Sequence, residues 1–256
     1  MTVDSAILAV VDALGLPPES RVDARVPKKL LVEQGAPTAA DKRAIQEGID
    51  ELQWLAACKA ATIGVPSFTD DVREYLEIAI IACVFRAGAK ASRLVELIHR
   101  AIPYPVLLIT ADEAGLTVSA AHKRAAQNEA QRVVIDGVVG VSGLHPEQDQ
   151  PEEQEFLRSL ALARQPRQSL WTLYEGWLSR IEALKAARLN GVYAATDDPE
   201  VIGRRRESLD AAAVLNRQLV GLHSQAKREK QLNRRVDLNL QIQRLEADLA
   251  THKKNL

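Results

Sequence analysis

Residues 74–110, EYLEIAIIACVFRAGAKASRLVELIHRAIPYPVLLIT, contain the segments that decide the fold. Two apolar runs, Glu74–Phe85 and Val106–Thr110, lie on either side of Lys90–Ala101. The runs are nearly continuous in apolar residues, which is typical of central strands in a sheet that is covered on both faces. The segment between them carries one helical stripe, formed by Leu94, Val95, Leu97 and Ile98. The stretch therefore predicts buried strands with an amphipathic helix between them.

Further elements are expected outward from this stretch in both directions. Apolar residues at helical spacing predict a helix over Ile7–Leu14, which Gly15 ends. The other expected elements are a strand over Val22–Glu33, a short helix over Thr38–Gly48, an extended segment over Ile49–Ile63, a hairpin at Gly115 that leads into a strand over Leu116–Ala121, and a last strand over Arg132–Val141. Together these elements predict a mixed sheet of about six strands with helices packed on it.

The character of the sequence changes after Gly143. A polar segment with prolines at residues 146 and 151 follows, and no strand pattern is present from there to the C-terminus. We therefore expect an α+β protein that consists of a mixed α/β domain over residues 1–144, a linker with a short helix over 145–167, and a helical arm over 168–256. The arm is expected to form an α-helical hairpin or a coiled coil.

An apolar seam runs along the arm at heptad spacing. The seam consists of Leu215, Leu219, Leu222, Leu238, Ile242, Leu245 and Leu249. The heptad register does not continue between Lys227 and Arg235, so a stutter or a break in the helix is expected there. One long helix cannot bury such a seam alone. We therefore expect it to fold back on the helix predicted over Leu170–Leu184 or to meet another chain.

The composition is that of a folded protein in a reducing compartment. Hydrophobic residues make up 46% of the chain, which is enough to close a core. Cys58 and Cys83 lie inside apolar runs, where packing is the commoner role of a thiol, and there is no framework of paired cysteines. The longest apolar run, Ile78–Ala89, is shorter than the roughly 20 residues of a transmembrane helix. These features predict a cytoplasmic protein without a membrane span.

The net charge of −1 is divided unevenly along the chain. Val201–Leu256 contains twelve Lys or Arg and six Asp or Glu, whereas residues 1–200 carry a net charge of −7. For basic clusters on a helix, a solvated helix face is the first interpretation, and contact with a phosphate backbone is the second. The candidate DNA contacts are Arg204, Arg205, Arg206, Lys227, Arg228, Arg234 and Arg235. Because few aromatic residues accompany them, any binding of nucleic acid is expected to be independent of base sequence.

A second group of polar residues lies at the ends of predicted strands. Lys28, Lys29, Lys59, His122 and Lys123 can form one polar patch if those strand ends are neighbours. The sequence does not place the strand ends relative to one another, so the patch is a hypothesis.

Motifs of catalysis are missing from the sequence. It contains no phosphate-binding loop, no Gly-x-Gly-x-x-Gly turn, no His-Glu-x-x-His and no Gly-x-Ser-x-Gly. The five histidines are scattered, and none is at metal-ligand spacing from a cysteine or another histidine. We therefore assign no catalytic residue and expect neither a metal site nor a cofactor.

A divergent metal-dependent nuclease is the enzyme that the sequence leaves open. Asp70, Asp71, Glu74 and Glu77 can supply carboxylates for Mg²⁺. The Glu-x-Lys half of the common nuclease core is missing from the predicted strands, so solvated carboxylates are the simpler interpretation.

Five stretches spread over nearly the whole chain are informative together: Val26–Leu30, Trp54–Lys59, Ala101–Ile109, Leu173–Leu178 and Gln231–Asn239. In this order they resemble domain-of-unknown-function family 4391. Genes of this prokaryotic family are commonly found beside those of a helicase and a DNA methyltransferase, in regions that look like restriction or phage-defence systems. The resemblance therefore implies an accessory subunit of such a system, with the helicase or the methyltransferase as its partner.

Three functions remain in contention. The first is a non-catalytic accessory or scaffolding subunit that docks a DNA-processing partner, or a second copy of itself, through the helical arm. The second is a divergent nuclease that uses the carboxylates at residues 70–77. The third is a DNA-binding protein without base specificity.

Overall fold

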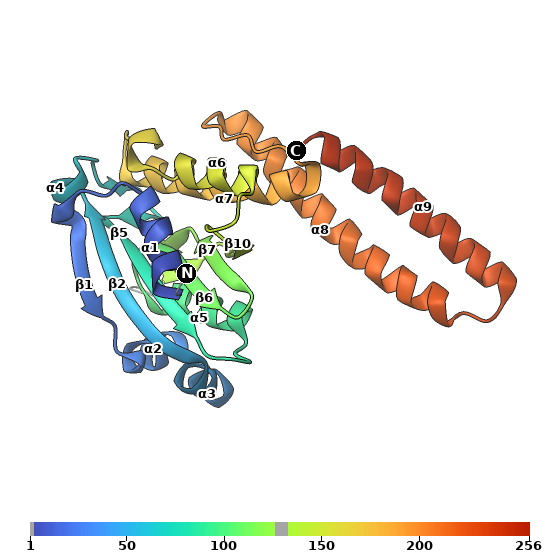
Figure 1. The fold of residues 1–256 in the computed structure, drawn as a ribbon, viewed down its shortest axis with the longest axis horizontal. Coiled ribbons are helices and arrows are strands. Elements are labelled where there is room, and N and C mark those ends of the chain that lie inside the picture. The colour runs from blue at the N-terminus through green and yellow to red at the C-terminus, as the bar shows by residue number, and fades with distance from the viewer. Residues whose placement is uncertain (1–2, 126–132) are drawn as a thin grey trace. The chain divides into compact units, whose positions relative to one another are not determined.

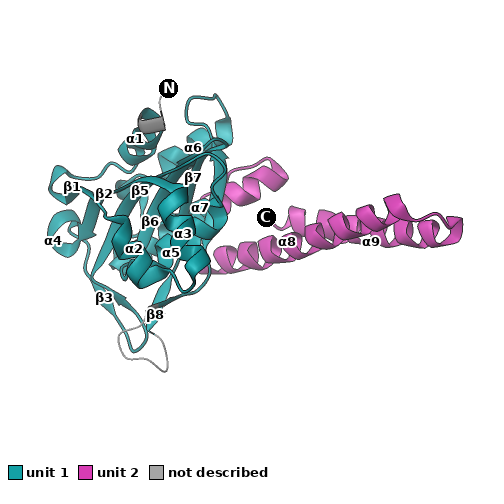
Figure 2. Ribbon diagram, turned by 90° about the horizontal axis from the view of Figure 1, so that it is seen from below, with its two compact units in different colours: residues 1–181 teal, residues 182–256 magenta. Residues whose placement is uncertain are grey.

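The computed structural model describes residues 3–125 and 133–256 (Figure 1). The chain forms two compact units, residues 1–181 and 182–256 (Figure 2). The first unit therefore extends beyond residue 144, where the sequence led us to place the end of the α/β domain. It includes α6 (Pro151–Ser159) and the first part of α7 (Leu170–Asn190) because Phe156 and Trp177, which these helices carry, are fully buried.

A mixed six-stranded sheet forms the centre of the first unit, as predicted. The strand order is β1-β2-β5-β6-β7-β10. These strands are β1 (Arg21–Arg25), β2 (Ile49–Lys59), β5 (Glu77–Phe85), β6 (Val106–Asp112), β7 (Gly115–Ala120) and β10 (Val139–Leu144). β5 and β6 are parallel and are joined by α5 (Ala91–Ala101), and the other neighbours are antiparallel. The strand–helix–strand arrangement expected for residues 74–110 is thus confirmed.

Shorter elements complete the first unit. They are α1 (Val3–Ala13), α2 (Lys28–Gly35), α3 (Ala39–Gly48), α4 (Ala60–Ile63), two 3₁₀ turns at Pro18–Ser20 and Leu162–Arg164, and two small sheets that pair β3 (Phe68–Thr69) with β4 (Glu74–Tyr75) and β8 (Lys123–Ala125) with β9 (Val133–Ile135). One face of the large sheet packs against α2, α3 and α5. Its core includes Leu31 of α2, Ile45 of α3, Ile98 of α5, Ile81 of β5 and Leu108 of β6.

Two of the predicted strands are divided in the structure. The strand expected over Val22–Glu33 is wrong in its second half, because β1 ends at Arg25 and α2 begins at Lys28. Pro27 is the N-cap of that helix, and because it has no backbone N–H it cannot continue the hydrogen-bonded ladder of β1. Of the strand expected over Arg132–Val141, Arg132 lies outside the described residues, and the remainder is split between β9 and β10 in different sheets.

The β6–β7 hairpin turns at Gly115, as expected. Gly115 has a φ of +114°, which residues with a side chain rarely adopt, and a Cβ at this position would lie 3.0 Å from the Leu144 carbonyl oxygen. Glycine is therefore required here both by backbone conformation and by the close approach of the chain after β10.

The second unit contains a helical hairpin, as predicted. α8 (Pro199–Arg228) and α9 (Leu232–Lys254) pack against each other side by side (Figures 1 and 2). Residues 229–231 connect them, which places the break inside the predicted interval from Lys227 to Arg235. Asp198 caps α8 by accepting a hydrogen bond from the backbone N–H of Glu200 at 2.9 Å.

Both cysteines are buried thiols. Cys58 lies in β2 and Cys83 in the adjacent β5. Burial raises the pKa of Cys58 to about 12 and also raises the pKa of Cys83, so neither is a reactive thiolate at neutral pH. The expectation that they serve packing agrees with this burial. In the part of the chain that the structure describes, no helix combines the length and apolar character needed to cross a membrane.

The contact between α3 and α5 includes an ion pair that links stability to pH. Arg93 of α5 donates to both carboxylate oxygens of Asp41, at 2.8 and 3.0 Å, and Thr38 donates to Asp41 at 2.7 Å. The hydrogen bond from Arg93, followed by that from Thr38, lowers the pKa of Asp41 from 3.8 to about 2. The ionised carboxylate thus stabilises the fold above about pH 3.8, and this contribution is lost as the pH falls through about 2.

We expect Asp41→Asn to lower the Tm at pH 7 and to have a much smaller effect at pH 2, where the carboxyl is about half protonated in the folded protein and almost fully protonated in the unfolded chain. Thermal unfolding measured by circular dichroism from pH 2 to 7 tests this. Asp50→Asn, which removes an exposed partner of Arg86 at 3.1 Å, is the control and is expected to change the Tm little at any pH. An equal loss of Tm at pH 2 and pH 7 for Asp41→Asn would contradict the expectation.

Candidate functional site

The seam residues face the inside of the hairpin. Leu219 of α8 and Ile242 and Leu249 of α9 form a buried cluster with Ala212. The partly buried residues packed against this cluster are Leu189, Leu215, Leu222, Ala226 and Leu245. Leu238, the remaining seam residue, is also partly buried. Most of the seam is therefore covered by packing of α8 against α9 within one chain.

A different set of apolar residues is exposed on α9. Leu232, Val236 and Leu240 are 64%, 49% and 48% exposed and follow one another at intervals of four residues. At 3.6 residues per turn this interval places them on one side of the helix. Leu240 lies two residues before the buried Ile242, about 200° around the helix. We call Leu232, Val236 and Leu240 the outer stripe, since they face away from the seam.

Basic side chains gather where the two helices join. We call Lys227, Arg228, Lys230, Arg234 and Arg235 the basic tip. All five are exposed, and none forms an ion pair or a side-chain hydrogen bond within residues 3–125 and 133–256. Glu229, the one acid among residues 227–235, accepts a hydrogen bond from the backbone N–H of Gln231 at 2.8 Å. Glu229 and Asp237 lie in the same surface pocket as Arg228 and Arg234, so the five cations of the basic tip outnumber the nearby acids and leave a net positive charge.

The basic cluster at residues 204–206 is arranged differently. Arg204 is exposed, whereas Arg205 is buried and donates to the Ala194 carbonyl oxygen at 2.6 Å. Arg206 pairs with Glu182 at 2.7 Å. Arg205 and Arg206 therefore make contacts within the second unit. Among the candidate DNA contacts, only Arg204 and the tip residues offer a guanidinium or ammonium group without a partner in the described structure.

The lysines of the predicted polar patch lie at two ends of the sheet. Lys28 donates to the carbonyl oxygen of Ile49, the first residue of β2, and Lys29 pairs with Glu33 at 3.5 Å. Lys59, the last residue of β2, pairs with Glu77 at 2.9 Å. An eleven-residue strand separates its ends by roughly 33 Å, so the five residues do not form one patch.

Lys123 is a buried structural lysine. Its Nζ donates to the carbonyl oxygens of His99, at 2.7 Å, and of Ile102, at the C-terminal end of α5. Burial lowers the pKa of Lys123 to about 7, while the carbonyl dipoles at the helix end favour the ammonium form. The side chain therefore caps α5 and is not open to a partner.

His122 connects three segments that are distant in the sequence. Its Nδ1 lies 2.7 Å from the hydroxyl of Tyr75, and its Nε2 lies 2.5 Å from a carboxylate oxygen of Glu175. The imidazole also stacks on Trp171, with ring centroids 4.1 Å apart. This arrangement resembles a base that is oriented by an acid, but Tyr75 is fully buried, so its hydroxyl is not available to a substrate. The cluster fastens β4 and the end of β7 to α7.

The four acids considered for a nuclease do not converge. Asp70 accepts hydrogen bonds from the backbone N–H groups of Val72 and Arg73, at 2.9 and 2.6 Å, and so shapes a turn. Glu77 is buried in its pair with Lys59, whereas Asp71 and Glu74 are exposed. Among the described residues no group of three or more His, Cys, Asp or Glu side chains can hold a metal ion.

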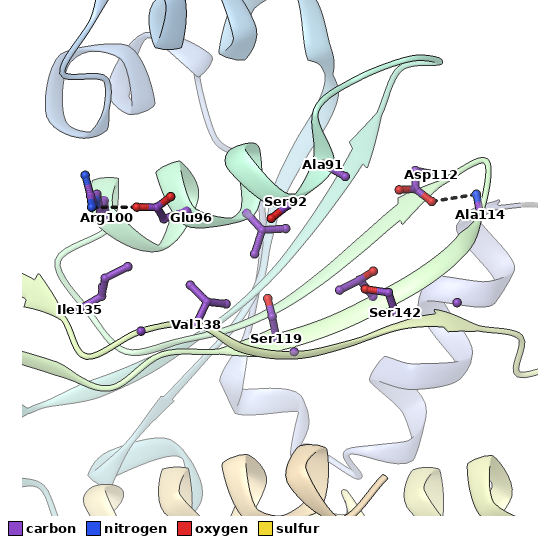
Figure 3. Close-up of a pocket in the computed structure, with 15 residues that line it drawn as sticks. Ala91, Ser92, Glu96, Arg100, Asp112, Ala114, Ser119, Ile135, Val138 and Ser142 are labelled. Carbon is purple, nitrogen blue, oxygen red and sulfur yellow. Dashed lines mark hydrogen bonds and ion pairs between the residues drawn. The ribbon is translucent and has the colours of Figure 1, made fainter. Parts of the chain in front are cut away.

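A cavity of about 660 Å³ with mixed polar and apolar walls lies between α5 and the strands β7 and β10 (Figure 3). Glu96 and Arg100 form an ion pair at 2.7 Å on its α5 side. Ser119 contributes to the opposite wall, and its hydroxyl lies 3.0 Å from Nε2 of the buried His99. Nδ1 of His99 has no hydrogen-bond partner in the described structure, and burial lowers the pKa of His99 to about 3. This Ser–His pair thus lacks both the orienting acid and the basicity of a hydrolase.

A second pocket, of about 310 Å³, is apolar. Its walls include Leu30 of α2, Trp54 of β2, Ile81 of β5 and Tyr104, which follows α5. The indole N–H of Trp54 is already bonded to the Ala56 carbonyl oxygen at 2.8 Å. The pocket therefore offers packing surface but no evident reactive group.

Comparison with known proteins yields one match. The sequence model of the family described as "Domain of unknown function (DUF4391)" matches residues 14–249, nearly the whole chain. No curated protein and no solved structure matches.

Proposed function

Because the chain belongs to the family described as Domain of unknown function (DUF4391), we propose a function from the geometry of its arm: it is a non-catalytic accessory or scaffolding subunit that docks a protein partner. The outer stripe is the observation that carries the proposal. Three large apolar side chains are exposed on one side of α9, and the seam does not use them. Apolar patches of this kind are typical of interaction sites.

The arm is suited to docking in two further respects. α8 and α9 have 30 and 23 residues, so the hairpin carries its surface on helices that are about 45 and 35 Å long. The heptad seam, which we propose packs as an antiparallel coiled coil, stiffens them. A partner helix can lie along the outer stripe because its residues are spaced by one turn each.

The resemblance noted from the sequence suggests the partner: a helicase or a DNA methyltransferase of a prokaryotic restriction or phage-defence system, in the cytoplasm. A second copy of the chain is the competing occupant of the stripe. The lack of a three-ligand metal cluster among the described residues makes the nuclease alternative less attractive than docking.

We expect the wild-type chain to co-purify with the co-expressed helicase or methyltransferase, and the triple variant Leu232→Ala/Val236→Ala/Leu240→Ala to bind at least about 100-fold more weakly. Full burial of a Leu or Val side chain contributes about 1.5–3 kcal/mol, and 2.7 kcal/mol corresponds to about 100-fold in Kd. Size-exclusion chromatography with light scattering, followed by titration calorimetry, gives the complex and its Kd.

The matched control is Val214→Ala/Val220→Ala, which removes exposed apolar side chains from α8 instead. It is expected to bind as the wild type does. A wild-type chain that binds neither partner and stays monomeric would overturn the proposal, and so would a triple variant with unchanged affinity. A complex that contains only copies of this chain would assign the stripe to self-association.

A further inference from the structure

Two arginines of the basic tip occupy an unfavourable position for helix stability. Lys227 and Arg228 lie in the last turn of α8, where cations interact favourably with the helix dipole. Arg234 and Arg235 lie in the first turn of α9, where the dipole is positive and no acidic residue is present. Helix stability therefore explains the positions of Lys227 and Arg228. It does not explain the positions of Arg234 and Arg235.

An anion bound from outside the chain would explain why Arg234 and Arg235 lie at this end of α9. The N-terminus of α9 carries backbone N–H groups without helical acceptors, and two arginines beside it add positive charge. Lys230, in the connection, adds a further cation. No tip residue is paired within the described part of the protein, so an incoming anion need not displace an internal ion pair.

The residues of the arm also indicate which polyanion fits. After Tyr193 the chain contains no Phe, Trp or Tyr, so the arm has no aromatic surface on which unpaired bases could stack. Contacts from arginine and lysine side chains to phosphate oxygens are then the main interaction that the arm offers to a nucleic acid. Guanidinium groups bind phosphate in a bidentate geometry, and five cations within nine residues match a repeating phosphate better than a single anion.

We propose that the basic tip binds the phosphate backbone of duplex DNA without base specificity. This goes beyond the docking function, because the tip and the outer stripe consist of different residues. Binding releases counterions from the DNA, so the logarithm of the association constant falls with the logarithm of the salt concentration by about 0.9 for each phosphate contacted. Three to five contacts give a slope between about −2.7 and −4.5.

The experiment is fluorescence anisotropy of a labelled duplex with the full chain at 50–300 mM NaCl. Arg234→Gln/Arg235→Gln is expected to weaken binding at 100 mM salt by at least about tenfold and to reduce the slope by about 1.8. The variant should fold at least as well as the wild type, because it removes cations from a helix N-terminus. The Tm of the arm checks this.

Two control variants, together with competition by polyglutamate, make the outcome decisive. Lys253→Gln/Lys254→Gln removes two cations from the other end of α9 and is expected to leave affinity and slope unchanged. Leu232→Ala/Val236→Ala/Leu240→Ala should also keep DNA binding, which separates this inference from docking. Three results would overturn the assignment to DNA. The wild-type chain would not bind the duplex at 50 mM salt, or the arginine variant would leave the salt slope unchanged, or polyglutamate would compete for the protein as effectively as unlabelled DNA.

Discussion

Ile242→Asp is expected to unfold the α8–α9 hairpin while leaving the first unit folded. Ile242 is 6% exposed and lies in the small cluster that holds the two helices together. An aspartate there would place an unpaired carboxylate among Leu219, Leu249 and their neighbours, which costs about 4 kcal/mol or more. The described cluster between α8 and α9 has four buried members, so the loss of one of them removes a large part of the apolar packing that joins these two helices.

Leu240→Asp is the matched control for this change. It introduces the same residue two positions earlier on the same helix, but on the exposed outer stripe. Its effect on folding is expected to stay within about 0.5 kcal/mol. Circular dichroism at 222 nm should show a loss of helix for Ile242→Asp alone.

Limited trypsin digestion gives a second measurement, because α8 and α9 contain Arg217 and Arg244 within their helices. Both sites should become rapidly cleaved in Ile242→Asp and stay protected in Leu240→Asp. Equal stability of the two variants would mean that the seam does not hold the hairpin. The pair of variants also separates folding from docking, because Leu240→Asp should disturb partner binding in a folded arm.

Trp177→Ala is expected to destabilise the first unit by about 3–5 kcal/mol. Trp177 is the largest fully buried side chain among the described residues, and its indole N–H donates to the Leu160 carbonyl oxygen at 2.9 Å. Truncation leaves both a cavity and a buried carbonyl without its partner. Since domains are stable by only about 5–15 kcal/mol, the loss is a large part of the total.

Thermal and urea unfolding of Trp177→Ala, followed by near-UV circular dichroism, measures this effect. Trp54→Ala removes a tryptophan that is only partly buried and should cost less. The comparison also tests the division of the chain, because Trp177 lies in the part of α7 that we assign to the first unit. Unchanged unfolding of the α/β unit in Trp177→Ala would contradict that assignment.

The spacing of apolar residues predicted a helix or strand correctly wherever one spacing, helical or extended, dominated a segment. The apolar runs of β5 and β6, the stripe of α5 and the break between α8 and α9 were all readable in this way. The pattern misled at Val22–Glu33, where alternating apolar residues continued across Pro27 although the chain turns into a helix there. The outer stripe was readable as Leu232, Val236 and Leu240 at intervals of four, but the heptad seam was the stronger signal on the same helix.

The sequence by itself determined the family, the mixed sheet and the helical hairpin, because these depend on spacing within short segments. Only the tertiary structure decided which groups remain free to act. It brought Tyr75, His122 and Glu175 together across 47 and 53 residues, buried Lys123 beneath the end of α5, and tied Arg205 to Ala194. It also turned the seam inward and left the outer stripe and the basic tip exposed. The physical reason is that burial and ion pairing involve residues that are far apart in the chain. A periodic pattern within one segment does not show which distant residue a side chain will contact.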